Sequence, residues 1–311
     1  MTEALPCPVC SSARTTLWTT AKDYEYSSTT DRYRYYACAD CDALFIDPVP
    51  SGLLSIIYPA NYYSFVDSKR TLVHRAKEAL DRRSFKKLFR SIAADRVNVL
   101  DIGGGTGWLS DLVRTVDNRV ALTQIVDIDR HARALAESKG HRYFEGPIEK
   151  FETRDRFHLV LMLNLIEHVA DPLALLQKAE SLLAPGGIIL VKTPNVRCWD
   201  ARLFRRFYWG GLHAPRHWVL FSEQSFRLMV GGTGLRIDKL QYTQGAPFWA
   251  YSIIALLHRK GLVRITANRP IIEHPLYPLL SAPFAAFDFA RSLFTKTAQM
   301  FIVLKKADSE Q

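Results

Sequence analysis

Apolar and polar positions change their period along the chain, and this change predicts an α/β fold. Short apolar runs typical of buried strands occupy 97–102, 121–126, 143–144, 158–163 and 188–192. Between them, apolar residues recur at helical spacing, most clearly in 108–113, 130–139 and 173–183. Strands that alternate with helices in this way form a doubly wound, mostly parallel sheet.

Two more strands are predicted at 235–242 and 298–304, which brings the sheet to seven. An insertion, 244–297, separates them and contains two apolar, aromatic-rich segments, 248–257 and 276–290. Each segment is too short to span a bilayer. We expect the insertion to act as a substrate lid or a dimer contact, with peripheral membrane contact as the alternative.

Two Cys-x-x-Cys pairs mark the N-terminal region. Cys7 and Cys10 form the first pair, and Cys38 and Cys41 form the second. Two such pairs predict a tetrahedral zinc site. Four thiolates leave no open position for substrate, so we expect structural Zn²⁺ that supplies folding energy to a unit with little core of its own.

The chain therefore divides into three predicted regions: a zinc ribbon over 1–50, a helical linker or cap over 51–96, and an α/β domain over 97–311. The linker contains a short helix at 51–58 and a basic helix at 69–96. We expect the basic face of the longer helix to be solvated, with contact to an anion or a membrane surface as the alternative.

The strand at 97–102 leads into a glycine-rich loop and then a helix, which are the parts of a nucleotide-binding βα unit. Glycine allows the backbone to approach a ligand closely. The Gly-x-Gly-x-x-Gly spacing of dinucleotide-binding loops fails here from each starting glycine. The pattern that fits is Asp-x-Gly-x-Gly-x-Gly, and it resembles the class I S-adenosylmethionine-dependent methyltransferases. Its residues are Asp101, Gly103, Gly105 and Gly107.

This resemblance implies a Rossmann-like methyltransferase fold whose last two strands pair as an antiparallel edge. It also implies the residues around the cofactor. Asp127, about 20 positions after the loop, is placed to accept both ribose hydroxyls. The implied cofactor-binding set is Asp101, Gly103, Gly104, Gly105, Gly107, Asp127, Ile128, Ile148 and Asn164. The sequence departs from the family at Pro147 and His158, where acidic residues are usual.

Other motifs resemble a bacterial subgroup that carries an N-terminal zinc ribbon and often acts on sugars or secondary metabolites. The first is Cys-Pro-x-Cys … Cys-x-x-Cys … Phe-x-x-Pro-x-Pro … Tyr-Pro-x-x-Tyr-Tyr, in which Tyr62 and Tyr63 are expected near the cofactor mouth. The others are Asn-x-x-Glu-His at 164–168, Leu-x-Pro-Gly-Gly followed by Pro-Asn at 183–195, and His-x-Pro-x-His-x-x-x-Phe-Ser at 213–222.

Methyl transfer from a sulfonium needs in-line alignment of the acceptor at about 3–3.5 Å. A hydroxyl or carbon acceptor also needs a base, and imidazole suits neutral pH. The base is predicted among His168, His213 and His217, with Glu167 a weaker choice.

Composition narrows the partners only slightly. The chain has 311 residues, 48% of them hydrophobic, and a formal net charge of +10. That charge permits nucleotide-sugars, nucleic acid or anionic lipid. The formal charges of the ribbon cancel, which weighs against an RNA methyltransferase. The expected acceptor is a small molecule, a sugar or glycan, or a lipid-linked molecule. A silent cofactor-binding scaffold is the other alternative. With no signal peptide, we expect cytoplasmic, possibly membrane-associated, protein.

Overall fold

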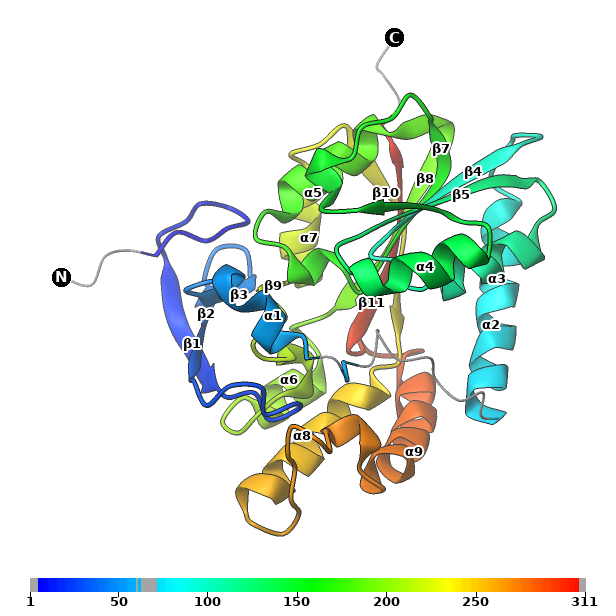
Figure 1. The fold of residues 1–311 in the computed structure, drawn as a ribbon. Coiled ribbons are helices and arrows are strands. Elements are labelled where there is room, and N and C mark those ends of the chain that lie inside the picture. The colour runs from blue at the N-terminus through cyan, green and yellow to red at the C-terminus, as the bar shows by residue number, and fades with distance from the viewer. Residues whose placement is uncertain (1–4, 60, 63–71, 308–311) are drawn as a thin grey trace.

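The chain folds around one seven-stranded sheet. The computed structural model describes residues 5–59, 61–62 and 72–307, without the side chains of 72–77. The strand order is β10-β11-β8-β7-β4-β5-β6, with parallel pairing from β8 to β6 and an antiparallel edge made by β11 and β10 (Figure 1). The bounds are β4 (Val97–Ile102), β5 (Val120–Asp127), β6 (Arg142–Glu145), β7 (Phe157–Leu163), β8 (Leu183–Pro194), β10 (Leu235–Thr243) and β11 (Gln299–Lys306). This arrangement confirms the predicted mostly parallel, Rossmann-like fold.

Helices cover both faces of this sheet. Successive side chains of a strand point to opposite faces, so a strand that is apolar throughout needs a helix on each side to bury it. In β7, Leu159 and Leu161 pack with α2 and α3, whereas Val160 and Met162 pack with α5 and α7. The helices are α2 (Leu72–Phe89), α3 (Trp108–Val116), α4 (Arg130–Ser138), α5 (Pro172–Ser181) and α7 (Glu223–Val230). Side-chain oxygens of Asp129, Asp171 and Ser222 cap three of these helices.

A second, smaller sheet lies against the first and has the strand order β1-β2-β3-β9 (Figure 1). Its strands β1 (Thr15–Ala21), β2 (Tyr33–Cys38) and β3 (Leu44–Asp47) come from the ribbon, and the short helix α1 (Leu54–Ile57) follows them. The fourth strand, β9 (Val219–Leu220), comes from the loop after β8. The large domain thus contributes a strand to the ribbon's own sheet.

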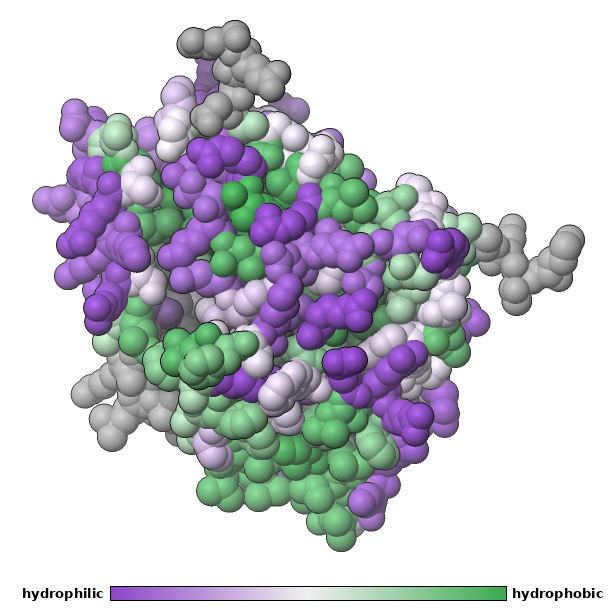
Figure 2. All heavy atoms as spheres, turned by 180° about the vertical axis from the view of Figure 1, so that it is seen from behind, coloured by the Kyte–Doolittle hydropathy of each residue, from purple (hydrophilic) through white to green (hydrophobic). Residues whose placement is uncertain are grey.

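The predicted insertion is helical. It folds as α8 (Ala246–Arg259) and α9 (Leu276–Arg291), which pack on each other and on the shorter α6 (Trp199–Phe204). Leu279 and Phe289 of α9 stay exposed, as does Phe294 just after this helix, and Figure 2 shows apolar surface gathered at this end of the molecule. Within the part of the chain that the structure describes, no helix combines the length and apolarity needed to cross a bilayer.

Two sequence-based boundaries are wrong. The helix predicted over 69–96 ends at Phe89, because the guanidinium of Arg119, 30 residues away, donates hydrogen bonds to the carbonyls of Phe89, Ile92 and Ala94. The strand predicted at 188–192 begins earlier, because Pro185, Gly186 and Gly187 lie inside β8, where the register with β7 shifts as in a β-bulge. A bulge tolerates the missing N–H of Pro185.

A buried ion pair fastens the ribbon to the large domain. Arg216 and Asp23 are both fully buried, and Arg216 Nη2 lies 2.8 Å from Asp23 Oδ2. Arg216 Nε also donates to the carbonyl of Ile57 at 2.6 Å, and the guanidinium stacks over the ring of Tyr26 at 4.6 Å. Burial alone raises the pKa of Asp23, but the Arg216 charge reverses this and the net pKa is lowered.

Replacement of Asp23 by Asn should therefore leave a buried, uncompensated guanidinium. Removal of one partner of a buried pair costs about 3–5 kcal/mol. We expect Asp23→Asn to lower the free energy of unfolding in denaturant titrations by this amount. Arg133→Ala, which removes an exposed helical pair with Glu137, is the control and should change stability little. Equal stability of the Asp23→Asn variant and the parent would contradict the role given to this pair.

Candidate functional site

The glycine loop between β4 and α3 has the backbone geometry that its sequence requires. Gly103, Gly105 and Gly107 have φ of +76°, +50° and +79°, the left-handed region that favours glycine. A Cβ on Gly104 would lie 2.7 Å from Cγ of Asp101, and one on Gly107 would lie 2.5 Å from the ring of His141. The loop thus packs closely on the side chains of Asp101 and His141, and Gly103 packs against Leu165, so a larger residue at Gly103, Gly104 or Gly107 would clash.

Asp127, the last residue of β5, points at this loop. Its Oδ2 accepts the N–H of Gly105 at 2.8 Å, and its Oδ1 accepts the N–H of Asp129 at 2.9 Å. Burial raises the pKa of Asp127, while these two hydrogen bonds oppose the shift. The carboxylate predicted to hold the ribose therefore lies beside the glycine loop.

The other residues of the predicted cofactor set lie in different surroundings. Asp101 is only 3% exposed and accepts a hydrogen bond from Ser110 Oγ at 3.0 Å, so it lies beneath the loop. Ile128 is exposed at the end of β5, whereas Ile148 is buried in the main core. Asn164 follows β7 with a φ of +54°, and its Oδ1 is buried without a hydrogen-bond partner among the described residues. Direct cofactor contacts of these side chains stay predictions.

Three histidines that the sequence singled out meet beyond the end of β7. The ring centroids of His168 and His217 are 4.6 Å apart, and those of His213 and His217 are 5.0 Å apart. Tyr58 hydrogen bonds to His168 Nδ1 at 2.9 Å, and Tyr62 hydrogen bonds to His213 Nε2 at 3.1 Å. The predicted Tyr63 lies outside the described residues.

His213 has a carboxylate partner that sequence reasoning missed. Its Nδ1 lies 2.5 Å from Oε2 of Glu25, which the ribbon supplies from 188 positions away, and the O–H of Tyr208 donates to the other oxygen of Glu25 at 2.7 Å. Glu25 is 1% exposed. The carboxylate fixes Nδ1 of His213 as the protonated nitrogen, which leaves Nε2 to accept a proton.

The other two histidines are held neutral. Burial lowers the pKa of His168 to about 3 and the pKa of His217 well below its usual value. His217 Nδ1–H donates to the carbonyl of Gly211 at 2.8 Å, so its Nε2 carries the lone pair. That lone pair lies 3.9 Å from Oε1 of Glu167, whose pKa burial raises to about 8.

The four predicted zinc ligands also come together. The sulfurs of Cys7 and Cys41 are 3.6 Å apart, those of Cys10 and Cys38 are 3.5 Å apart, and all four lie within 4.8 Å of one another. Thiolates at roughly 2.3 Å from a tetrahedral zinc ion would be roughly 3.8 Å apart. A disulfide would need about 2.05 Å. The cluster therefore has the spacing of a metal site rather than of two disulfides.

Parts of this chain are similar in sequence to known proteins. Ubiquinone biosynthesis O-methyltransferases match it, one from Rhodopseudomonas palustris with 32% identity over 128 residues, which covers 38% of this chain and 48% of that protein. The relative from Nitrobacter winogradskyi has 29% identity over 128 residues, with 38% and 47% covered. The chain thus spans about half the length of these curated relatives.

Among solved structures, coclaurine N-methyltransferase bound to N-methylheliamine and SAH aligns with a TM-score of 0.49 and 14% identity, over 83% of this chain and 81% of that chain. The sequence profile of a methyltransferase domain matches residues 68–240, which is more than half of the chain. The chain therefore belongs to the methyltransferase domain family.

Proposed function

We propose that this protein transfers a methyl group from S-adenosylmethionine to a hydroxyl of a small-molecule acceptor. The observation that carries the proposal is the carboxylate of Asp127 beside three left-handed glycines. Dinucleotide-binding loops have a different glycine spacing. The curated relatives are O-methyltransferases, which supports an oxygen acceptor.

The hydrogen-bond acceptors of the site fit such a cofactor. S-adenosylmethionine has a sulfonium and an ammonium, which are stabilised by negative charge. Its ammonium and its two ribose hydroxyls donate hydrogen bonds and need acceptors. The site offers the carboxylate of Asp127 and the unpartnered Oδ1 of Asn164. Bound there, the cofactor would supply an activated methyl carbon, and the protein would align the acceptor and remove its proton.

His213 is the best placed of the three predicted bases. Glu25 holds its Nδ1–H, so Nε2 carries the lone pair that would take the proton of an acceptor hydroxyl. The acceptor hydroxyl would replace the O–H of Tyr62, which hydrogen bonds to Nε2 in the structure. His168, with a pKa lowered to about 3, is a poor base at neutral pH. We assign His168 and His217 to the packing and polarity of the pocket instead.

Two alternatives from the sequence, an RNA methyltransferase and a silent scaffold, stay alternatives. The exposed apolar side chains of α9 support a contact surface in the insertion, and its partner, a lipid surface or a second copy of the chain, stays a prediction. The zinc ribbon is a proposal as well, supported by the spacing of the four sulfurs.

Titration calorimetry and turnover together test the methyl-transfer proposal. The parent should bind S-adenosylmethionine, and Asp127→Asn should weaken this binding. His213→Ala should lower turnover by about 10²–10⁴-fold, the usual contribution of a general base, and Glu25→Gln by less. Turnover is followed as release of S-adenosylhomocysteine with a panel of phenols and nucleotide-sugars. Loss of cofactor affinity in His213→Ala equal to that in Asp127→Asn would make His213 structural.

Metal analysis tests the ribbon. Native mass spectrometry should find one Zn²⁺ per chain, and Cys38→Ser should lose it and destabilise the ribbon, since binding energy and folding energy are the same in such sites. Cys198→Ser, which changes a buried cysteine outside the cluster, is the control and should keep the metal. Absence of metal from the purified parent protein would rule out the zinc proposal.

The raised pKa of Glu167 makes a prediction about pH. Its carboxyl stays protonated in the folded protein up to about pH 8 but ionises near pH 4.5 in the unfolded chain. The unfolded state therefore binds fewer protons, and the contribution of Glu167 to stability falls as pH rises through this window.

Replacement of Glu167 by Gln should remove this loss. We expect the unfolding free energy of Glu167→Gln, relative to the parent, to increase between pH 5 and pH 8. Glu223 provides a control of opposite sign, because its hydrogen bonds with Lys296 and Tyr242 lower its pKa to about 2. Glu223→Gln should be less stable than the parent at pH 8. Parallel pH curves for the parent and Glu167→Gln would show that Glu167 is ionised in the fold.

A further inference from the structure

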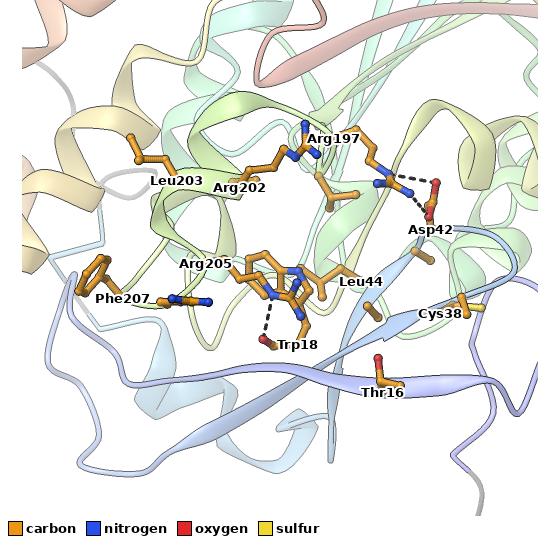
Figure 3. Close-up of a pocket in the computed structure, with 16 residues that line it drawn as sticks. Thr16, Trp18, Cys38, Asp42, Leu44, Arg197, Arg202, Leu203, Arg205 and Phe207 are labelled. Carbon is orange, nitrogen blue, oxygen red and sulfur yellow. Dashed lines mark hydrogen bonds and ion pairs between the residues drawn. The ribbon is translucent and has the colours of Figure 1, made fainter.

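Two adjoining cavities outside the methyl-transfer site are lined by basic side chains. The larger, of about 790 Å³, lies between the ribbon strands and α6 (Figure 3). The smaller, of about 310 Å³, shares Arg206 and Phe207 with it. None of the histidines of the site described above, nor Asp127 or the glycine loop, lines either cavity.

The larger cavity has a fixed rim. Arg197 forms an ion pair with Asp42 across it, with Nε 3.0 Å from Oδ2. Thr19 Oγ1 donates to the carbonyl of Arg205 at 3.1 Å, and the guanidinium of Arg205 lies 5.6 Å from the ring centroid of Trp18. These contacts hold β1 and the β2–β3 turn against α6, so the cavity is a built feature of the fold.

The charges within the cavities are unbalanced. Asp42 is the one carboxylate among the lining residues of either cavity, and Arg197 already neutralises it. Arg205 is held by the carbonyl and ring of Trp18. The other cations have no ion-pair or hydrogen-bond partner for their side chains among the described residues: Arg202 and Arg206 in the larger cavity, and Lys22, Arg32, Arg206 and Arg259 in the smaller. Guanidinium groups bind phosphoryl oxygens through two parallel hydrogen bonds.

We propose that the two cavities together bind a small organic diphosphate, with its phosphoryl groups at Arg202 and Arg206 and its organic part along the apolar wall. Cavities of this size match small ligands. Phe207 is 45% exposed at the seam, and Leu44, Leu203 and Val196 line the larger cavity. A nucleobase or a prenyl chain fits such a wall equally well.

The same features disfavour single-stranded nucleic acid. Sequence-tolerant binding of that kind uses aromatic side chains on which successive bases stack along a groove. Here Arg205 already lies over the ring of Trp18, which leaves Phe207 as the exposed aromatic of the cavities. The proposal does not depend on methyl transfer, because none of its residues belongs to the methyl-transfer site.

Calorimetric titration of the full-length protein at low salt tests the proposal. The probes are uridine diphosphate, farnesyl diphosphate, inorganic pyrophosphate, orthophosphate and an oligouridine RNA. Uridine is chosen over adenosine so that the probe does not compete for an adenosyl site. We expect an organic diphosphate to bind more tightly than orthophosphate and to weaken as salt rises. Whether the uridine or the farnesyl compound binds better identifies the source of the ligand.

Arg206→Ala should weaken diphosphate binding by about tenfold or more, the loss expected for a charge-assisted contact. Arg206→Lys should restore part of it. Arg154→Ala is the matched control, because Arg154 is also an exposed arginine without an ion-pair partner among the described residues but lies away from both cavities. The thermal midpoint of each variant checks its folding.

Three results would overturn the proposal: no binding of any diphosphate, equal weakening by Arg206→Ala and Arg154→Ala, or binding of RNA without binding of diphosphates. A parallel titration with S-adenosylmethionine separates this proposal from the first. Binding of a diphosphate without binding of S-adenosylmethionine would contradict the proposed methyl transfer but support the diphosphate site.

Discussion

The guanidinium of Arg216 is the contact on which the arrangement of the site depends. A buried charge of this kind needs a buried partner, and Asp23 of the ribbon supplies it. The same guanidinium binds the carbonyl of Ile57 and stacks on Tyr26, so ribbon, linker and large domain meet at one side chain. Asp23 in turn accepts the backbone N–H groups of Glu25 and Tyr26, which orients Glu25 toward His213.

The active-site proposal is therefore composite. The cofactor side comes from the ends of β4 and β5, whose geometry is local to the Rossmann-like sheet. The acid–base side comes from a loop of the large domain and a carboxylate of the ribbon. In this proposal, docking of the ribbon is a condition for orienting His213. A zinc ion held by the four cysteines would then act on the chemistry indirectly, by keeping the ribbon folded.

The sequence predicted those features that local pattern determines. The sheet strands, the glycine loop and each Cys-x-x-Cys pair follow from residues within a short window. The role of Glu25 could not be predicted, because its partner His213 lies 188 positions away and its own segment is polar, which favours an exposed hairpin. The strand β9 could not be predicted, because two residues are too few to show the alternation of apolar and polar positions typical of a strand. Its pairing with β3 also requires the ribbon to pack against the large domain.

Burial of the ribbon's acids makes the charge at its surface differ from its formal charge. Asp23 and Glu25 count fully toward a balanced ribbon, yet both are buried against Arg216 and His213. Their charges are paired inside the molecule, while Lys22 and Arg32 of the same segment line the smaller cavity together with Arg206, just after α6, and Arg259 of α8. A ribbon that is neutral by composition thus contributes two cations, Lys22 and Arg32, to the smaller cavity. Part of the protein's net charge of +10 lies in the lining of the two cavities. Asp23 pairs with Arg216, and Glu25 pairs with His213. Neither acid is therefore left to pair with the cations of the neighbouring cavity.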